Sequence, residues 1–295
     1  MKTIIETHAL SKYYGKHRGI ESIDLKVEEG DFFGFIGPNG AGKSTTIRIL
    51  LGLLKKSSGS GKVFGREVGP NQLEILKSIG YMPSEAIFYP NLKGEEVVKF
   101  SAKLHGTYSE NKVDRLAKQF DLDLTKKVKD LSLGNRKKIS ILCALQHHPP
   151  LYIFDEPTSG LDPLMQQIFW EEIMRRNGEG ATIFVSSHVL SEVQKYCHTA
   201  AIIRQGQIIA QAPMKDLIAT SMKQVHILGV NQVDLPGMSK VQRDDQSISF
   251  MYQGPIASLI SQLQDQQDKI IDLSINQPDI ETIFMHYYQK DAGDE

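Results

Sequence analysis

Cysteine is scarce in this sequence: only Cys143 and Cys197 occur among its 295 residues. Two cysteines cannot build a disulfide framework, and this usage is typical of proteins in a reducing cytosol. No run of about eighteen apolar residues is present, so we expect no membrane-spanning helix. Residues 1–6 lack the apolar run of a signal peptide. The formal net charge is only −1, which argues against a general nucleic-acid-binding protein.

What the sequence does contain is a glycine-rich segment at residues 37–45, between an apolar run at residues 32–36 and a predicted helix. The segment has the pattern GxxxxGK[ST] of a phosphate-binding loop. In such a loop the glycines let backbone N–H groups turn inward around an anion, and the helix start adds its positive dipole end. We therefore expect Lys43 to reach the β- and γ-phosphates of a nucleotide and the Ser44 hydroxyl to hold Mg²⁺. The candidate nucleotide-binding residues of this segment are Gly37, Pro38, Asn39, Gly40, Ala41, Gly42, Lys43, Ser44 and Thr45.

Two acidic residues, Asp155 and Glu156, directly follow the apolar residues 151–154. Such a run is typical of a buried parallel strand, and in doubly wound sheets ligands bind where the strands end. We expect Asp155 to hold Mg²⁺ through water and Glu156 to orient or deprotonate an attacking water molecule. The alternative, two exposed carboxylates at a strand end, fits poorly with a phosphate-binding loop upstream. A second buried strand, predicted at residues 181–188, ends in His188.

Apolar residues recur with strand periodicity in residues 2–30 and with helix periodicity in residues 92–148. Between the first two strands, residues 11–16 form a predicted polar turn that carries Tyr13 and Tyr14. An aromatic ring there either stacks on a purine or packs on the sheet, and the spacing alone leaves both open. We further predict a turn at 57–61, strands at 62–65 and 79–83, a helical turn at 73–76 and a hairpin formed by 200–203 and 207–210.

The sequence pattern changes near residue 218. Residues 1–217 have the pattern of an α/β fold, a P-loop NTPase core with an N-terminal antiparallel β subdomain and a helical subdomain at about residues 85–148. Residues 218–295 predict a small C-terminal α+β domain, large enough for a modest core. Its predicted strands are 223–228, 247–252 and 269–274, and its predicted helices are 255–266 and 279–289.

Taken in order, these segments resemble the nucleotide-binding subunit of an ABC transporter, almost continuously over residues 1–215. The resemblance implies that residues 37–45 form the Walker A loop. It also implies that Asp155 and Glu156 are the Walker B aspartate and the catalytic glutamate. His188 then corresponds to the switch histidine that contacts the γ-phosphate.

Two further positions acquire implied roles from the same resemblance. Tyr14 corresponds to the aromatic residue that stacks on adenine. Asp162 ends the D-loop at residues 159–162, and its place before a proline also predicts a helix N-cap. We therefore expect Asp162 both to cap a helix and to take part in communication across a dimer. The tail at residues 278–288 is similar to C-terminal extensions of exporter-type ATPase subunits in bacteria.

Two segments depart from the family pattern. The family signature LSGGQ stands here as LSLGN at residues 131–135. Ser132 and Gly134 keep their places and Asn135 replaces the glutamine, so a helix N-terminus still faces a γ-phosphate. The glutamine that normally reaches Mg²⁺ is replaced by Ser84. A serine is too short for direct coordination unless the backbone shifts, so we expect Ser84 to act only through a bridging water.

The family mechanism implies a homo- or heterodimer of ATPase subunits that sandwiches two ATP molecules. Each ATP is held by the phosphate-binding loop of one subunit and by residues 132–135 of the other. Closure on ATP and reopening after hydrolysis drive a separate transmembrane permease, so we expect a cytoplasmic subunit on the inner face of the membrane. The apolar residues 86–90 are expected to dock this permease, unless they are buried under the helical subdomain. The implied cofactors are ATP and Mg²⁺, and export is inferred from family analogy alone.

Two other classes of function fit the sequence less well. A soluble ABC ATPase that acts on ribosomes or nucleic acid usually has two cassettes in one chain or a long coiled-coil insert, and neither is present. The nearly balanced charge also disfavours that class. A non-hydrolysing regulatory module is disfavoured by the intact Lys43, Asp155 and Glu156. The sequence leaves the transported substrate open.

Overall fold

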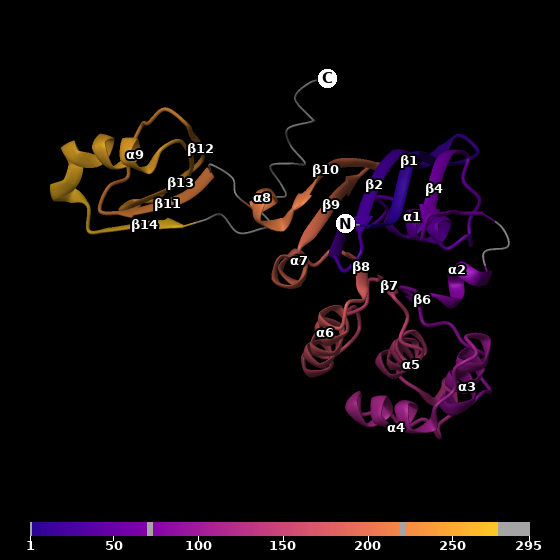
Figure 1. Ribbon diagram of the computed structural model, residues 1–295. Helices are drawn as coiled ribbons and strands as arrows, with labels where there is room; N and C mark the ends of the chain where they lie inside the picture. Colours follow the sequence, from indigo (N-terminus) through magenta and orange to yellow (C-terminus); the bar gives the residue numbers. More distant parts are fainter. Residues whose placement is uncertain (1, 70–72, 219–221, 277–295) are drawn as a thin grey trace. The chain divides into compact units, whose positions relative to one another are not determined.

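The computed structural model describes residues 2–69, 73–218 and 222–276. The chain divides into two compact units, the first ending at Met214 and the second beginning at Lys215 (Figure 1). Each unit encloses a hydrophobic cluster of its own. The first unit combines two β-sheets with packed helices, which is the α/β architecture that the sequence predicts.

The first sheet of this unit is antiparallel and consists of β1 (Thr3–Tyr14), β2 (His17–Glu28), β4 (Ser58–Val63) and β5 (Arg66–Glu67), in the order β2–β1–β4–β5. On β2 the apolar residues Ile23, Leu25 and Val27 are buried, while the polar residues between them are exposed. The period-two pattern therefore turns one face of this sheet to the core.

Residues 57–61, which the sequence predicts to form a turn, lie mostly in strand β4, so that prediction is wrong. β4 pairs antiparallel with β1 across an irregular register. Gly59 has a φ of 77°, and a β-carbon on it would lie 2.2 Å from the backbone oxygen of Ala9. The glycine at this position permits the close approach of two strands, and it does not reverse the chain.

The predicted turn at residues 11–16 is also shorter than expected. β1 continues as a strand through Tyr14, and the chain reverses at Gly15 and Lys16. Gly15 has a φ of 60°, in the left-handed region that a tight hairpin requires. The reversal therefore places Tyr14 at the very end of the β1–β2 hairpin.

The second sheet consists of β3 (Phe32–Ile36), β6 (Ile79–Met82), β7 (Leu151–Asp155), β8 (Thr182–Ser187), β9 (Thr199–Arg204) and β10 (Gln207–Pro213). The strand order is β10–β9–β3–β8–β7–β6, and all neighbours except β10 and β9 are parallel. β9 and β10 form the predicted hairpin. β3, β7 and β8 are buried throughout, as the apolar runs within them predict, and the polar ends of β7 and β8 are buried as well. The segments that follow β3, β6, β7 and β8 therefore meet at one edge of the sheet.

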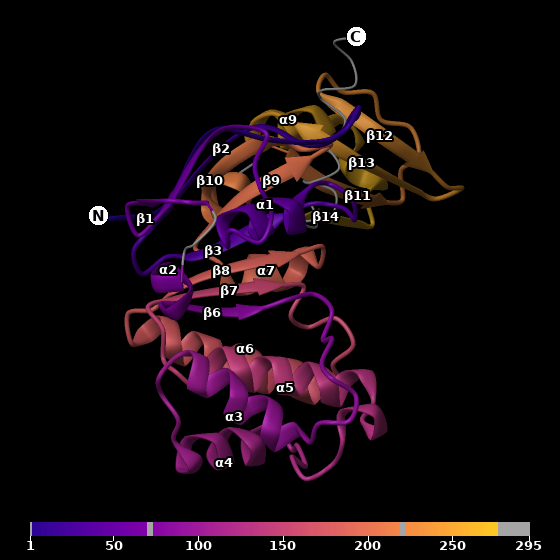
Figure 2. The same cartoon turned by 90° about the vertical axis from the view of Figure 1, so that its right-hand side faces the viewer.

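The helices of this unit are α1 (Lys43–Leu50), α2 (Leu73–Lys77), α3 (Gly94–Leu104), α4 (Glu110–Gln119), α5 (Leu133–Leu145), α6 (Pro163–Gly178) and α7 (Leu190–Tyr196), with a 3₁₀ turn at Val128–Asp130. Helix α8 (Met214–Ile218) begins at the last residue of this unit and continues into the second. α1 contacts strands of both sheets. α5 and α6 lie on the opposite side of the six-stranded sheet from α1 (Figure 2). α3 and α4 pack against α5, within the region of helix periodicity.

The second unit contains β11 (Met222–Leu228), β12 (Met238–Arg243), β13 (Ser247–Gln253), α9 (Ile256–Leu263), a 3₁₀ helix (Gln264–Lys269) and β14 (Asp272–Asn276). Its sheet is antiparallel, in the order β12–β13–β11–β14. The sequence prediction missed β12, because its side chains are mostly polar and exposed and show no alternation. The strand predicted at 269–274 is β14, which begins later, at Asp272. The helix predicted at 255–266 is α9, which ends earlier, at Leu263, because a 3₁₀ helix follows it. The predicted helix at 279–289 lies outside the described residues.

Two imidazole rings stack where α3 and α5 end. The ring centroids of His105 and His147 are 3.7 Å apart, with 15° between the ring planes. Nε2 of His147 lies 3.2 Å from the backbone oxygen of Ile79 in β6. Burial, with a further contribution from His105, lowers the pKa of His147 from 6.5 to about 4. The folded protein therefore keeps His147 neutral at pH values where an unfolded chain protonates it.

This shift predicts a loss of stability in mild acid. Between about pH 6.5 and about pH 4 the unfolded state binds more protons at His147 than the folded state does. The contribution of His147 to the free energy of unfolding is thus complete above pH 6.5. It declines by about 2–3 kcal/mol as the pH falls through this window. The melting temperature of His147→Gln should fall less steeply from pH 7.5 to 4.5 than that of the wild type, while the exposed control His8→Gln follows the wild type. Parallel profiles for all three proteins would contradict this account.

The separate cores predict that the part of the chain after α8 can be removed. Met214 and Leu217 of α8 are buried, and the N–H of Met214 donates to the backbone oxygen of His198 at 2.7 Å. A chain ending at Ile218 keeps this helix and should remain soluble, unfold cooperatively and bind nucleotide. Circular dichroism melting and nucleotide titration calorimetry measure these properties. An insoluble truncated chain would mean that the second unit covers core surface of the first.

Candidate nucleotide-binding site

A cavity of about 400 Å³ opens where the segments after β3, β6 and β7 meet. Tyr14, Arg18 and Gly19, at the end of the β1–β2 hairpin, also line the cavity. All of the residues around it are candidates from the sequence, apart from Arg18 and Gly19. The lining residues are Tyr14, Arg18, Gly19, Pro38, Asn39, Gly40, Gly42, Lys43, Ser44, Thr45, Ser84 and Glu156.

The phosphate-binding loop turns at Gly40 and Gly42, which have φ values of 80° and 111°. Both values lie in the left-handed region that glycine adopts readily. A β-carbon on Gly42 would also lie 2.6 Å from Cγ2 of Ile20, so the packing excludes a side chain there. Gly42 is the N-cap of α1, and the first residues of that helix line the cavity. Gly37 and Ala41 are buried behind the loop and do not line the cavity.

Lys43 connects the loop to the neighbouring strand ends, and only 6 % of its side chain is exposed. Its Nζ donates hydrogen bonds to the backbone oxygens of Gly37 at 2.6 Å and Pro38 at 3.2 Å. The same nitrogen lies 3.1 Å from Oε1 of Glu156. The ammonium group therefore joins the segment after β3 to the segment after β7.

Glu156 has a φ of 52°, a left-handed conformation that residues other than glycine rarely adopt. Its backbone N–H donates to the backbone oxygen of Ser186 at 3.1 Å. Its Oε2 lies 2.6 Å from Nδ1 of His188, which follows β8. Lys43, Glu156 and His188 thus form one continuous row of interacting side chains, although they are distant in the sequence.

Asp155 is almost fully buried at the end of β7 and does not line the cavity. The hydroxyl of Ser186 donates to its Oδ1 at 2.5 Å. The same hydroxyl oxygen accepts the N–H of Glu156 at 3.3 Å. Ser186 therefore orients both acidic residues. Sequence reasoning did not single out this serine, although the polar end of its strand was a usable signal.

Ser132, Gly134 and Asn135 lie outside the cavity. Ser132 is the N-cap of α5, and its Oγ accepts the N–H of Asn135 at 3.3 Å. A β-carbon on Gly134 would lie 3.1 Å from the backbone oxygen of Gly160, so the first turn of α5 packs on the segment that follows Glu156. The candidate nucleotide-binding residues thus fall into two groups, one that lines the cavity and one at the N-terminus of α5 outside the cavity.

Asp162 also lies outside the cavity, at the start of α6. Its Oδ1 accepts the N–H of Met165 at 3.0 Å, and Pro163 occupies the first turn of the helix. This contact confirms the predicted N-cap.

Comparison with known proteins agrees with this arrangement. Residues 20–159 match the model of the ABC transporter family. The bacitracin transport ATP-binding protein BcrA of Bacillus licheniformis is 39% identical over 223 residues, which cover 74% of this chain and 72% of that protein. The linearmycin resistance ATP-binding protein LnrL of Bacillus subtilis is 30% identical over 96% of this chain and 97% of its own length. A solved ATP-binding subunit of an ABC transporter superposes with a TM-score of 0.68 at 32% identity, covering 73% of this chain and 92% of that one.

The chain belongs to the ABC transporter ATP-binding family. It is an ATPase and the ATP-hydrolysing subunit of a transporter, as the resemblance in its sequence implies. The match to LnrL extends over nearly the whole ABC subunit, beyond the P-loop core. None of the helices formed by the described residues is long and apolar enough to cross a membrane.

Arg18 and Gly19 of this ABC subunit were missed by sequence reasoning. They reach the cavity because the β1–β2 hairpin pairs Tyr13 with Arg18. Arg18 is also held by Glu21, with 2.9 Å between its Nη1 and the carboxylate Oε2. No pattern along the chain marks these residues, since only the hairpin register places them beside the phosphate-binding loop.

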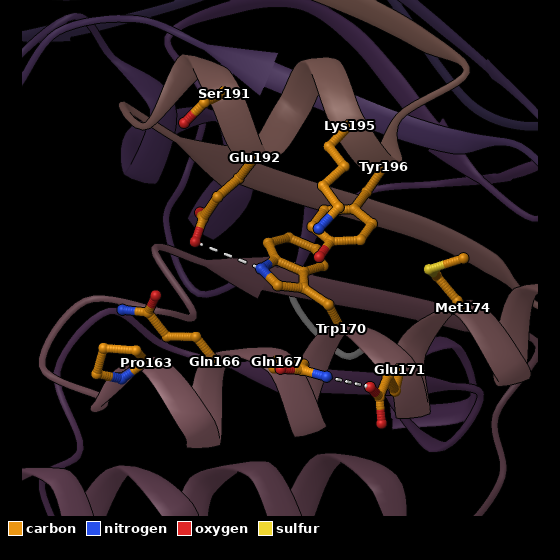
Figure 3. Close-up of a pocket in the computed structure, with 10 residues that line it drawn as sticks. All are labelled: Pro163, Gln166, Gln167, Trp170, Glu171, Met174, Ser191, Glu192, Lys195 and Tyr196. Carbon is orange, nitrogen blue, oxygen red and sulfur yellow. Dashed lines mark hydrogen bonds between the residues drawn. The ribbon is translucent and has the colours of Figure 1, made fainter.

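A second cavity of about 560 Å³ lies between α6 and α7 and holds none of the predicted site residues (Figure 3). Its wall includes Glu192, whose Oε1 accepts the indole N–H of Trp170 at 3.3 Å (Figure 3). The other carboxylate oxygen accepts the hydroxyl of Thr158 at 2.9 Å. Burial raises the pKa of Glu192. This carboxylate links the segment after Glu156 to the helix after His188, a connection that the sequence did not reveal.

Proposed function

We propose that the cavity beside Lys43 is the ATP site and that hydrolysis takes place there. Lys43 binds the β- and γ-phosphates, and the backbone N–H groups of residues 37–45 surround them. Glu156 orients or deprotonates the attacking water, and His188 contacts the γ-phosphate. The observation that supports this most strongly is the position of Glu156, 3.1 Å from Lys43 and 2.6 Å from His188.

Tyr14 stacks on the adenine ring in this proposal. It lines the cavity at the end of its hairpin, and 47% of the residue is exposed. One edge of the ring lies close to β2, since a β-carbon on Gly19 would be 2.7 Å from Cε2 of Tyr14, and nearly half of the residue stays accessible for stacking. Stacking of two planar aromatic systems adds a favourable contact beyond burial of area.

Mg²⁺ fits the oxygen donors of the site. Ser44 lines the cavity, and Asp155 ends strand β7, which lies one strand beyond β8 in the sheet, with a buried carboxylate. Within the described residues, no cluster of three or more His, Cys, Asp or Glu side chains occurs. Mg²⁺ suits this sparse set, because it usually keeps several waters and takes substrate phosphates as ligands. When bound, it supplies positive charge that neutralises the phosphates. Ser84 also lines the cavity and contributes through a bridging water.

The subunit works as a dimer in this proposal. Ser132, Gly134 and Asn135 lie outside the cavity of their own chain, so they are free to face the ATP of another ATPase subunit. The start of α5 offers the N–H groups and positive dipole end that favour a phosphate. Leu133 and Leu164, beside this helix start and that of α6, are 58% and 62% exposed, which fits a surface that a second subunit covers. Asp162 lies at the same surface.

In this proposal the subunit lies on the inner face of the membrane, where its closure on ATP and the subsequent hydrolysis drive a separate transmembrane permease. Ile87 and Tyr89, in the loop after Ser84, are 80% and 76% exposed, while Ala86 is buried. Exposed apolar side chains next to the ATP cavity are suited to binding a protein partner. The names of BcrA and LnrL refer to bacitracin transport and linearmycin resistance. We extend this to the present chain as export of antibiotic-like compounds.

Replacing Glu156 tests the proposed mechanism. Glu156→Gln should retain ATP binding and lower kcat by at least about 100-fold, or about 2.7 kcal/mol of barrier, because the group that activates water is lost. The variant should also accumulate as an ATP-bound dimer in size-exclusion chromatography. Turnover at the wild-type rate would remove Glu156 from the mechanism.

Ser84→Ala is the matched comparison, assayed in the same saturating Mg²⁺. Its hydroxyl acts through water, so its loss should change kcat by less than about 10-fold, or under about 1.4 kcal/mol. If the alanine variant is as inactive as Glu156→Gln, Ser84 coordinates the metal directly and the water-mediated role is wrong.

A further inference from the structure

One buried lysine connects helix α5 to the backbone of Glu156. Lys137 lies near the start of α5, and only 3% of the residue is exposed. Its ammonium group donates to the backbone oxygens of Glu156 and Ser159, both at 2.6 Å. Among the described residues it forms no ion pair with a carboxylate. The two backbone carbonyls are therefore its direct hydrogen-bond partners.

A lysine in this position carries a cost that simple packing does not explain. Burial lowers the pKa of Lys137, although the nearby charges of Glu156 and Asp155 act in the opposite direction. An apolar side chain of similar length would fill the same space without removing a charge from water. What an apolar side chain cannot supply is a pair of strong, directed hydrogen bonds to this backbone.

The backbone of Glu156 requires such support. Its φ of 52° is a conformation that persists only where surrounding contacts hold it. The N–H of Glu156 is held by Ser186, and its carbonyl is held by Lys137, so both peptide groups around its α-carbon are fixed. With the backbone fixed, the carboxylate is directed between Lys43 and His188.

The same helix carries residues 132–135 at its first turn. Lys137 follows Asn135 by two residues, which is a rise of roughly 3 Å along the helix axis. The helix start also packs on the segment around Gly160. A displacement of the first turn therefore moves the Lys137 ammonium relative to Glu156, because a helix transmits such a shift as a stiff unit.

We propose that Lys137 is a positioning residue that fixes the backbone of Glu156 and couples it to residues 132–135. The proposal depends on the proposed role of Glu156 in hydrolysis. Lys137 would thereby connect the two nucleotides of a dimer. When residues 132–135 of one subunit contact the ATP bound by the other subunit, the shift of α5 adjusts Glu156 of the subunit that carries these residues.

Lys137→Met tests the positioning role. Methionine has a similar length and apolar character but donates no hydrogen bond. We expect kcat to fall by at least about tenfold while KM for ATP changes by less than about threefold, because no ATP-contacting residue is altered. A drop in ATP affinity as large as the drop in kcat would indicate general damage to the site and overturn the proposal.

Lys138→Met is the matched control. Lys138 is the next residue of α5 and is also buried, but its ammonium donates to the backbone oxygen of Asp121 at 3.3 Å, away from Glu156. Its kcat should stay within about twofold of the wild type. An equal loss of kcat in both variants would mean that any buried lysine of this helix matters, which overturns the specific role of Lys137.

A double variant separates positioning from an independent effect. If Lys137 acts through the Glu156 carboxylate, adding Lys137→Met to Glu156→Gln lowers the residual kcat by less than about twofold. A multiplicative loss overturns the proposal. Wild-type turnover of Glu156→Gln would instead overturn the proposed function itself, whereas normal turnover of Lys137→Met alone would overturn only the present inference.

Lys137→Gln covers the case in which the methionine variant does not fold. Glutamine keeps N–H donors on a shorter, uncharged side chain and reaches fewer acceptors. Its kcat should lie between that of the wild type and the value expected when the contact is absent, at least about tenfold lower, with an unchanged KM for ATP. Wild-type kcat in this variant, with Lys137→Met unfolded, would overturn the proposal.

Discussion

The ion pair between Lys43 and Glu156 connects the two sides of the proposed ATP site. Its atoms are 3.1 Å apart, and the two side chains are 6% and 14% exposed, so water screens the attraction only weakly. This contact exists because β3 and β7 flank β8 in a parallel sheet and end at the same edge. Gly40 and Gly42 give the phosphate-binding loop the backbone conformation in which Lys43 reaches Glu156.

The segment after β7 is held by side chains from several helices. Lys137 of α5 binds the carbonyls of Glu156 and Ser159, and Glu192 of α7 accepts the hydroxyl of Thr158. The contacts involve the buried ammonium group of Lys137 and the half-buried carboxyl group of Glu192, and such hydrogen bonds have strong directional preferences. Apolar packing alone would tolerate small slips of this segment. The polar contacts make its position depend on where each helix lies, which suits a site that must respond to a second subunit.

The two departures from the family pattern have limited structural consequences. The cap of α5 uses the Ser132 hydroxyl and the backbone N–H of Asn135, so it is insensitive to the side chains at positions 133 and 135. Leu133 instead adds exposed apolar surface. Ser84 lines the cavity proposed to bind ATP, where a side chain shorter than glutamine leaves room for water.

Local patterns along the chain were sufficient for the phosphate-binding loop, the buried strands, the N-cap at Asp162 and the family. These features depend on residues close in sequence, through periodicity, glycine conformations and caps. Local patterns failed for the polar edge strand β12, and for β4, where Gly59 permits close strand contact and no turn. They also gave no sign of Arg18, Lys137 or Glu192. Each of these acts on residues from another element, and only the pairing of strands and the packing of α5 and α7 bring those partners within hydrogen-bond distance.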